Sequence, residues 1–234
     1  RSVKITYDGK KSVTMPKSGY LLVNGKTVTP AKKYFDAFKS GSITFVDNGS
    51  GKYEVAHMTM LLQSVIEGVN AEKETVVLRY DNQTIKLEDV DVYEVYLNNK
   101  ASELSALTSG MAVGIACDSF TVSSGVITYN YTNAELIRLY ASDNVTEGVV
   151  DAMDGEKIYI DDMPIVIGAG YNRLLAGGKL HALTLGEYVK AYKDNYGELL
   201  YYEIDAEKSS MKYGYLIKAG VNASGIKHCL QLKI

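Results

Sequence analysis

Residues 47–54 are the part of the chain closest in pattern to a metal-binding loop. A calcium loop places oxygen donors at alternate positions and then turns the chain with a glycine. The alternate positions here hold Asp47, Gly49 and Gly51, so two of the three donors are missing. The pattern therefore favours an ordinary turn between strands, and a weak calcium site near Asp47 stays open as an alternative.

The histidines and cysteines, which could act as nucleophiles or ligands, are isolated in sequence. His57 adjoins an apolar run and is predicted to be a partly buried strand residue. His181 stands where a similar segment elsewhere in the chain has Ser105, so that position does not require an imidazole. Cys117 and Cys229 form no CxxC pair, which excludes a zinc knuckle and a disulfide-rich scaffold. We expect two buried free thiols that do not pair with each other.

No recognised catalytic or nucleotide-binding motif is present. The chain lacks the GxSxG elbow, the HExxH helix, the Walker loop and the GxGxxG fingerprint. Residues 168–170 contain two glycines but are followed by no helix start, so a phosphate cradle is not predicted. The acidic pair at 161–162 is predicted to lie in a solvated turn. The sequence thus predicts no catalytic residue, no metal ligand and no cofactor, and hence a protein that is not an enzyme.

Composition narrows the class of partner. The hydrophobic content of 46% and charged content of 23% are typical of a globular protein, and the net charge of −3 argues against nucleic acid as a partner. The chain has 19 tyrosines, 4 phenylalanines and no tryptophan. Because carbohydrate platforms usually rely on tryptophan, we interpret the tyrosines as strand residues that face cross-strand partners.

The ends of the chain and its apolar runs bear on its location. No apolar run approaches the ~20 residues that a membrane-spanning helix needs. The chain begins at Arg1 with neither a methionine nor a signal peptide, which indicates a mature chain or an excised piece. It ends inside an apolar alternation that a strand would continue, which favours the excised piece.

Turn signals between β-rich segments are frequent. Asp8-Gly9, Asn24-Gly25 and Asp154-Gly155 each supply the positive φ angles of a tight hairpin turn. The chain has 21 glycines and 3 prolines, as expected of a sheet protein that turns on glycine. Further strands are predicted where β-branched and tyrosine residues gather, at residues 43–46, 75–80, 112–117, 126–131, 188–193, 199–204 and 213–217.

Helical patterns are scarce. Residues 30–39 are the best candidate, with Thr29 as N-cap, proline at the first position and Gly41 as the stop. Residues 101–107 are expected to form one short helical turn, and residues 171–178 are expected to form a loop. No low-complexity linker separates these segments, so neighbouring modules are predicted to abut directly.

The chain also repeats itself. Residues 104–113 return at 180–189 with six of ten positions identical, which places Gly110 and Gly186 76 residues apart. Residues 68–71 return at 220–223, twice that period away. Two matches on one period indicate one supersecondary unit used several times. Both glycines follow a threonine by two residues and are predicted to form equivalent tight corners before a strand.

The order of these segments resembles that of the tandem β modules of surface-layer and related cell-wall proteins of clostridial type. The resemblance implies small β-barrel-like modules with a structural role in an extracellular assembly, and it supplies no catalytic residues. It spans residues 43 to 232 and covers the N-terminal 40 residues poorly. The segments that carry it are residues 44–54, 84–87, 107–113, 145–162, 183–204 and 213–219.

Together these patterns predict a mainly β protein of tandem small β-barrel-like or β-sandwich modules of about 76 residues, with a few short helices. The predicted divisions are residues 1–68, a partial repeat; 69–144 and 145–220, two full modules; and 221–234, a closing strand or the start of a further repeat.

The function predicted from this organisation is a non-catalytic spacer or assembly array of a bacterial cell-surface protein, located outside the cell or in the cell wall. Its expected partners are neighbouring modules, like subunits or a cell-wall polysaccharide. Two alternatives stay open: a module that binds glycans or a cell-wall polymer, and a structural module of a phage or virion.

Overall fold

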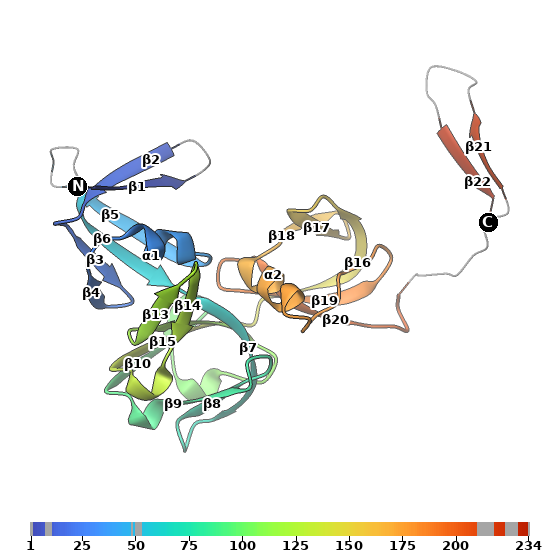
Figure 1. Cartoon of the computed structure of the whole chain (residues 1–234). Coiled ribbons are helices and arrows are strands. Elements are labelled where there is room, and N and C mark those ends of the chain that lie inside the picture. The colour runs from blue at the N-terminus through green and yellow to red at the C-terminus, as the bar shows by residue number, and fades with distance from the viewer. Residues whose placement is uncertain are drawn as a thin grey trace.

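The computed structural model describes residues 2–7, 11–47, 49, 53–209, 218–222 and 229–233. The predicted mainly β fold is confirmed, because strands make up 55% of the structure, against the ~20–25% of an average protein. Figure 1 shows three bodies in chain order: an N-terminal unit of residues 2–60 in blue, a middle unit of residues 62–142 in green, and a third unit of residues 145–204 in yellow and orange. Within the described residues the sheets are open rather than closed barrels.

The N-terminal unit combines a hairpin with a four-stranded sheet in the order β4-β3-β6-β5. The sheet is mixed, because β3 runs parallel to β6 while its other pairs are antiparallel. Its core contains the buried side chains of Leu21, Met58 and Met60. The elements are β1 (Ser2–Tyr7), β2 (Lys11–Pro16), β3 (Tyr20–Val23), β4 (Lys26–Val28), α1 (Lys32–Ala37), β5 (Gly41–Asp47) and β6 (Tyr53–Met60).

The middle unit is a seven-stranded sheet in the order β11-β10-β15-β12-β7-β8-β9. The separate hairpin β13–β14 leaves this sheet between β12 and β15, and its Phe120 and Ile127 pack against both the middle and the N-terminal cores. The elements are β7 (Leu62–Asn70), β8 (Thr75–Leu78), β9 (Gln83–Lys86), η1 (Leu87–Asp89), β10 (Val92–Leu97), β11 (Lys100–Ser102), η2 (Leu104–Ala106), β12 (Ala112–Cys117), β13 (Phe120–Ser123), β14 (Val126–Tyr129), η3 (Tyr131–Asn133) and β15 (Leu136–Ser142).

The third unit is a five-stranded antiparallel sheet in the order β18-β17-β16-β19-β20, with one helix, α2, beside it (Figure 1). A separate hairpin, β21–β22, follows it in the chain. The strand predicted at residues 213–217 and the turn predicted at Asp8-Gly9 lie outside the described residues. The elements are β16 (Val145–Met153), β17 (Lys157–Ile160), β18 (Met163–Val166), α2 (Ala169–Ala176), β19 (Tyr188–Lys193), β20 (Leu199–Ile204), β21 (Lys218–Asn222) and β22 (Cys229–Lys233).

The middle and third sheets share one strand order. Five adjacent strands of the middle sheet, β15-β12-β7-β8-β9, follow the same sequence of neighbours as β20-β19-β16-β17-β18. In both, the pairing of the central strand with the next strand shifts register, between Ile66 and Gly68 and between Val150 and Ala152. The segments that join the strands differ in length, so corresponding strands are not separated by a constant number of residues.

The predicted module boundaries meet these strands in different ways. The boundary between residues 144 and 145 falls just before β16. The boundary between 68 and 69 falls inside β7, and the one between 220 and 221 falls inside β21. A period of 76 residues fits the spacing of the glycine corners. It does not fit the starts of the two units at β7 and β16, because the connections within the middle unit are longer.

The predicted glycine corners are confirmed, and so is the hairpin turn at Asn24-Gly25. A turn also joins β16 to β17 at Asp154-Gly155, but it has three residues, and of the predicted pair only Gly155 has a positive φ, 88°. Gly110 and Gly186 have φ angles of 88° and 87°, the left-handed conformation in which a side chain is strained. Their N–H groups donate to the carbonyl oxygens of Ile66 and Val150, both at 2.8 Å. Asn24 and the glycine after it have φ angles of 50° and 94°, as a type I′ turn requires.

The predicted helix at residues 30–39 is shorter than expected. α1 spans Lys32–Ala37, and its N-cap position is occupied by Ala31, which has no side-chain acceptor, rather than by Thr29. Gly41 does not stop the helix. It opens β5 instead, where its φ of 127° lets the backbone pass the carbonyl of Thr59. Packing on the N-terminal core, rather than capping, therefore holds this short helix.

The predicted loop at residues 171–178 is wrong, and so is the absence of a helix start after Gly168. α2 begins at Ala169 and buries Tyr171 and Leu174. It ends in a Schellman motif, in which the N–H of Gly178, at φ 65°, donates to Leu175 while the next N–H donates to Leu174. The pair Gly177-Gly178, which ends α2, is the feature of the sequence that indicates a helix here. The helical turn predicted at 101–107 is the 3₁₀ helix η2, preceded by β11.

We expect Gly186→Val to destabilise the fold by about 1–3 kcal/mol, because valine is strained at a φ of 87°. Gly68→Val is the matched control, since Gly68 has ordinary φ and no atom within 4 Å of its missing Cβ. Chemical denaturation of the two variants measures the difference. Equal destabilisation of both would show that the corner conformation carries no special cost.

Candidate functional site

The candidate metal-ligating and catalytic residues considered in the sequence analysis do not form a common site. The Asp47 carboxylate accepts a hydrogen bond from the Gly49 N–H at 2.9 Å, which is the contact of an Asx turn. His57 lies in β6 as predicted but is exposed, because Ala56 and Met58 on either side of it point into the core. His181 is exposed in the loop before β19.

The described residues contain no group of three or more histidine, cysteine or acidic side chains that could hold a metal ion. In the same part of the chain, no helix is long and apolar enough to span a membrane.

Cys117 is a free and buried thiol at the end of β12, as predicted. Burial raises the pKa of this thiol to about 11, and its Sγ lies 3.4 Å from the carbonyl oxygen of Ser119. At neutral pH almost all of the sulfur is therefore protonated, which makes it a core residue rather than a nucleophile.

A buried, hydrogen-bonded polar cluster lies where the N-terminal unit meets the middle unit. Asn24 is 3% exposed, and its amide nitrogen donates to the Cys117 carbonyl and to the Tyr129 hydroxyl, both at 3.0 Å. Its Oδ1 accepts from the N–H of Met60 at 2.8 Å. The Tyr129 hydroxyl donates in turn to the Met60 carbonyl at 2.7 Å. Three strands and one turn are thus joined by bonds that water cannot reach.

A cavity of about 340 Å³ opens where all three units meet. The side chain of Gln63, which is 3% exposed, lies on its wall and donates to the Ser40 hydroxyl at 2.8 Å. A Cβ at Gly114 or at Gly170 would crowd this side chain, so both glycines make room for it. The other lining residues are mostly apolar: Ala37, Lys39, Met60, Leu61, Leu62, Gly125, Val126, Ile127, Ala169 and Arg173.

The boundary between the middle and third units combines apolar packing with ion pairs, among them Arg79 and Glu203 at 3.6 Å. Arg173 of α2 contacts Asp81 at 2.7 Å, and it also donates to the Gln63 carbonyl at 2.8 Å. The Tyr201 ring stacks on Tyr192 with centroids 4.2 Å apart, and its hydroxyl donates to the Gly110 carbonyl. A small shared core completes the contact, formed by Val65, Ala112, Leu174, Leu200 and Tyr201.

A polar groove of about 450 Å³ lies along the same boundary, at the ends of β10 and β15. The Asn99 amide donates to the Asn195 carbonyl at 2.9 Å, and the Asn98 amide donates to Asp143 at 2.7 Å. Burial raises the pKa of the Asp194 carboxyl, which nevertheless accepts backbone N–H bonds within its turn. The lining residues are Asn98, Asn99, Ser142, Asp143, Asn144, Val145, Asp194, Asn195 and Gly197.

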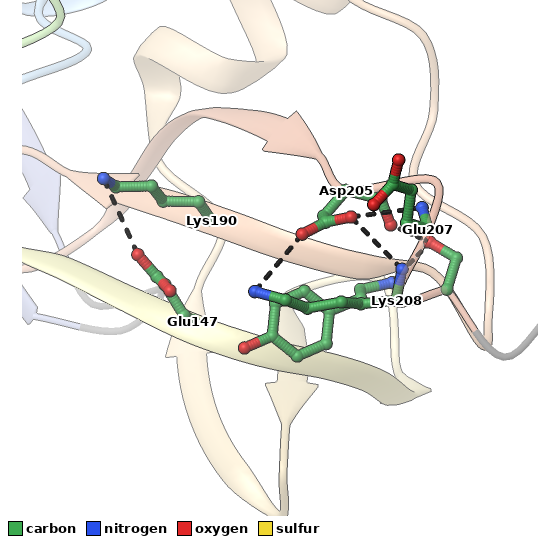
Figure 2. A network of polar contacts seen from close by, with 7 residues as sticks. Glu147, Lys190, Asp205, Glu207 and Lys208 are labelled. Carbon is green, nitrogen blue, oxygen red and sulfur yellow. Dashed lines mark hydrogen bonds and ion pairs between the residues drawn. The ribbon is translucent and has the colours of Figure 1, made fainter.

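A second polar surface lies on β16, β19 and the end of β20, and Figure 2 shows its ion pairs. Lys190 and Glu147 are 3.6 Å apart, and Lys208 and Asp205 are 3.3 Å apart. All four side chains are at least one-third exposed, so water and salt screen these pairs and they add little to stability. The Asp205 carboxylate also accepts the backbone N–H groups of Glu207 and Lys208, which makes it a turn residue.

Sequence reasoning identified none of the boundary residues. The sequence patterns predict only a turn at Asn24 and no role for Gln63 or Arg173. A buried polar residue that bonds a distant partner leaves no local pattern, as with Asn24 and Cys117, which are 93 positions apart. No protein-family model matches the chain, and no curated protein or solved structure matches it either.

We expect Asn24→Gly to destabilise the protein by about 1–3 kcal/mol, because the turn keeps its positive φ while three buried bonds are lost. Tyr129→Phe removes the hydroxyl alone. A double-mutant cycle measured by chemical denaturation should give a coupling of about 0.5–3 kcal/mol between the two. Strictly additive effects would mean that the cluster does not act as one network.

We expect Cys117 to resist thiol reagents in the folded protein. In a Cys229→Ser background, reaction with a disulfide reagent should be slow at pH 8 and accelerate about tenfold per pH unit, since the thiolate fraction rises up to a pKa of about 11. Reaction in denaturant is the control for accessibility. Rapid labelling of the native protein at pH 8 would contradict the buried thiol.

Proposed function

We propose that the chain is a rigid, non-catalytic array of β units that sets spacing or assembly in an extracellular bacterial surface structure. The observation that carries the proposal is that buried hydrogen bonds cross the first unit boundary and partly buried ones cross the second, while the connections are minimal. Leu61 alone separates β6 from β7, and Asp143 and Asn144 alone separate β15 from β16. Units joined in this way behave as one body, since independent motion would break these polar bonds.

We further infer that the middle and third units are copies of one repeat, the second of them shortened. The shared strand order and the matching bonds of Gly110 and Gly186 support this inference. On the same reading, β21 and β22 would begin another copy. Gly220 lies in the first strand of that hairpin, as Gly68 lies in the first strand of the β7–β8 hairpin.

A non-catalytic role is supported by the reactive residues, which differ between the middle and third units. Cys117 ends β12, whereas the last residue of β19, its counterpart, is Lys193. The glycine corners and apolar strand positions recur while the reactive groups differ. A repeat retained for shape needs only the former. The extracellular setting rests on the resemblance to surface-layer modules described above.

The rigidity of the array can be measured with spin labels at Glu88 and Met163, two exposed positions in the middle and third units. In a Cys229→Ser background, pulsed electron resonance should give one narrow distance distribution. Arg173→Ala should broaden it, because the bonds to Asp81 and to the Gln63 carbonyl are lost.

Lys190→Ala is the control for this experiment, since it removes an exposed ion pair within the third unit and should leave the distribution unchanged. A broad distance distribution in the labelled protein with Arg173 intact would mean that the units move independently. That outcome would overturn the rigid spacer.

A further inference from the structure

We propose that the polar groove between the middle and third units, together with the tyrosine pair Tyr96 and Tyr140, is a binding site for a neutral oligosaccharide. This site does not depend on the spacer function. Saccharides present apolar C–H faces and rings of hydroxyl groups, so they are recognised by aromatic faces next to planar amides and carboxylates. Both kinds of group meet at this boundary.

The aromatic part comes from two neighbouring parallel strands. Tyr96 of β10 pairs with Tyr140 of β15, and their rings stack with centroids 5.0 Å apart and an interplanar angle of 8°. On its other side Tyr96 pairs with Ala101 of β11, which has a small side chain. Both tyrosines are only partly buried, so part of the pair is accessible to a ligand.

The tyrosine pair is held in place before any ligand arrives. The Tyr96 hydroxyl donates to Glu94 at 2.9 Å, and Arg138 donates to the same carboxylate oxygen at 2.7 Å. A ring fixed in this way loses little conformational freedom on binding. Because the Arg138 charge is already paired with Glu94, it does not select for an anionic ligand.

The polar part continues from the same strands. Ser142 follows Tyr140 by two positions in β15, so it lies on the same face of the sheet, about 7 Å further along. Asn98 follows Tyr96 by two positions, and both Asn98 and Ser142 line the groove. The amides and the hydroxyl of the groove thus follow the two tyrosines by two positions along the chain.

The third unit supplies the opposite wall. Asp194, Asn195 and Gly197 line the groove, and Tyr196, in the same turn, is 47% exposed. Each amide has two N–H donors and one acceptor, so Asn98 and Asn99 have capacity beyond their bonds to Asp143 and Asn195.

Charge selects among saccharides. The groove contains the carboxylates of Asp143 and Asp194 and no basic side chain. Acidic sugars would be repelled, while neutral hydroxyl and acetamide groups would be accepted. The ligand class is therefore a neutral oligosaccharide, with one ring on Tyr96 and the next in the groove.

The probes for this site are chitotetraose and cellotetraose, with tetragalacturonate as the acidic comparison. Titration calorimetry on the full chain should show saturable binding of at least one neutral tetrasaccharide and none of the acidic one. Tyr96→Ala should weaken that binding about tenfold, the loss expected for one aromatic contact, while Tyr96→Phe retains it.

Asn98→Gly tests the polar half of the site, since glycine tolerates the φ of 51° and removes only the amide. It should also weaken binding about tenfold. Tyr20→Ala, at a tyrosine 63% exposed in β3, is the matched control and should leave affinity unchanged. Thermal melts of all variants establish that they fold.

Three results would overturn the proposal. One is the absence of saturable binding for both neutral tetrasaccharides, and another is a preference for tetragalacturonate. The third is binding that persists at full strength in folded Tyr96→Ala and Asn98→Gly variants.

Discussion

A single residue, Leu61, separates β6 from β7, so the backbone passes directly from the sheet of the N-terminal unit into the sheet of the middle unit. Met60 ends β6 opposite Gly41 of β5. Its N–H donates to Asn24 of the N-terminal unit, and its carbonyl accepts from the Tyr129 hydroxyl of the middle unit. Buried peptide groups without partners would cost about 1–3 kcal/mol each, so these two side chains stabilise the passage between the sheets.

The same passage determines how the third unit attaches. Two residues after Leu61, the Gln63 side chain lies between Gly114 of β12 and Gly170 of α2, because neither glycine has a Cβ to exclude it. The Gln63 carbonyl then accepts a hydrogen bond from Arg173 of α2. Residues 60–63 are therefore in contact with all three units, and a change in the backbone of this segment would alter the contacts at both boundaries.

The sequence was informative where local chemistry decides the structure. Asn24-Gly25 predicts a tight turn because few residue types tolerate its φ angles, and the same reasoning holds for the corner at Gly186. It failed for α2, whose eight residues contain a buried glycine at position 170 and gain their stability from packing on β20. The sequence also explains only part of the role of Asn24. Its turn propensity is visible in the sequence, whereas its hydrogen bonds to Cys117 and Tyr129 are not.

The residues at the boundary between the middle and third units serve two purposes. Asn99 and Asn195 bond to each other across it, and both also line the polar groove. A saccharide in that groove would touch both units, so its binding energy would add to the bonds that hold them together. By linkage, a ligand that prefers the docked arrangement must stabilise that arrangement. Spacing and binding are then not competing functions, since the more rigid boundary is also the better-formed site.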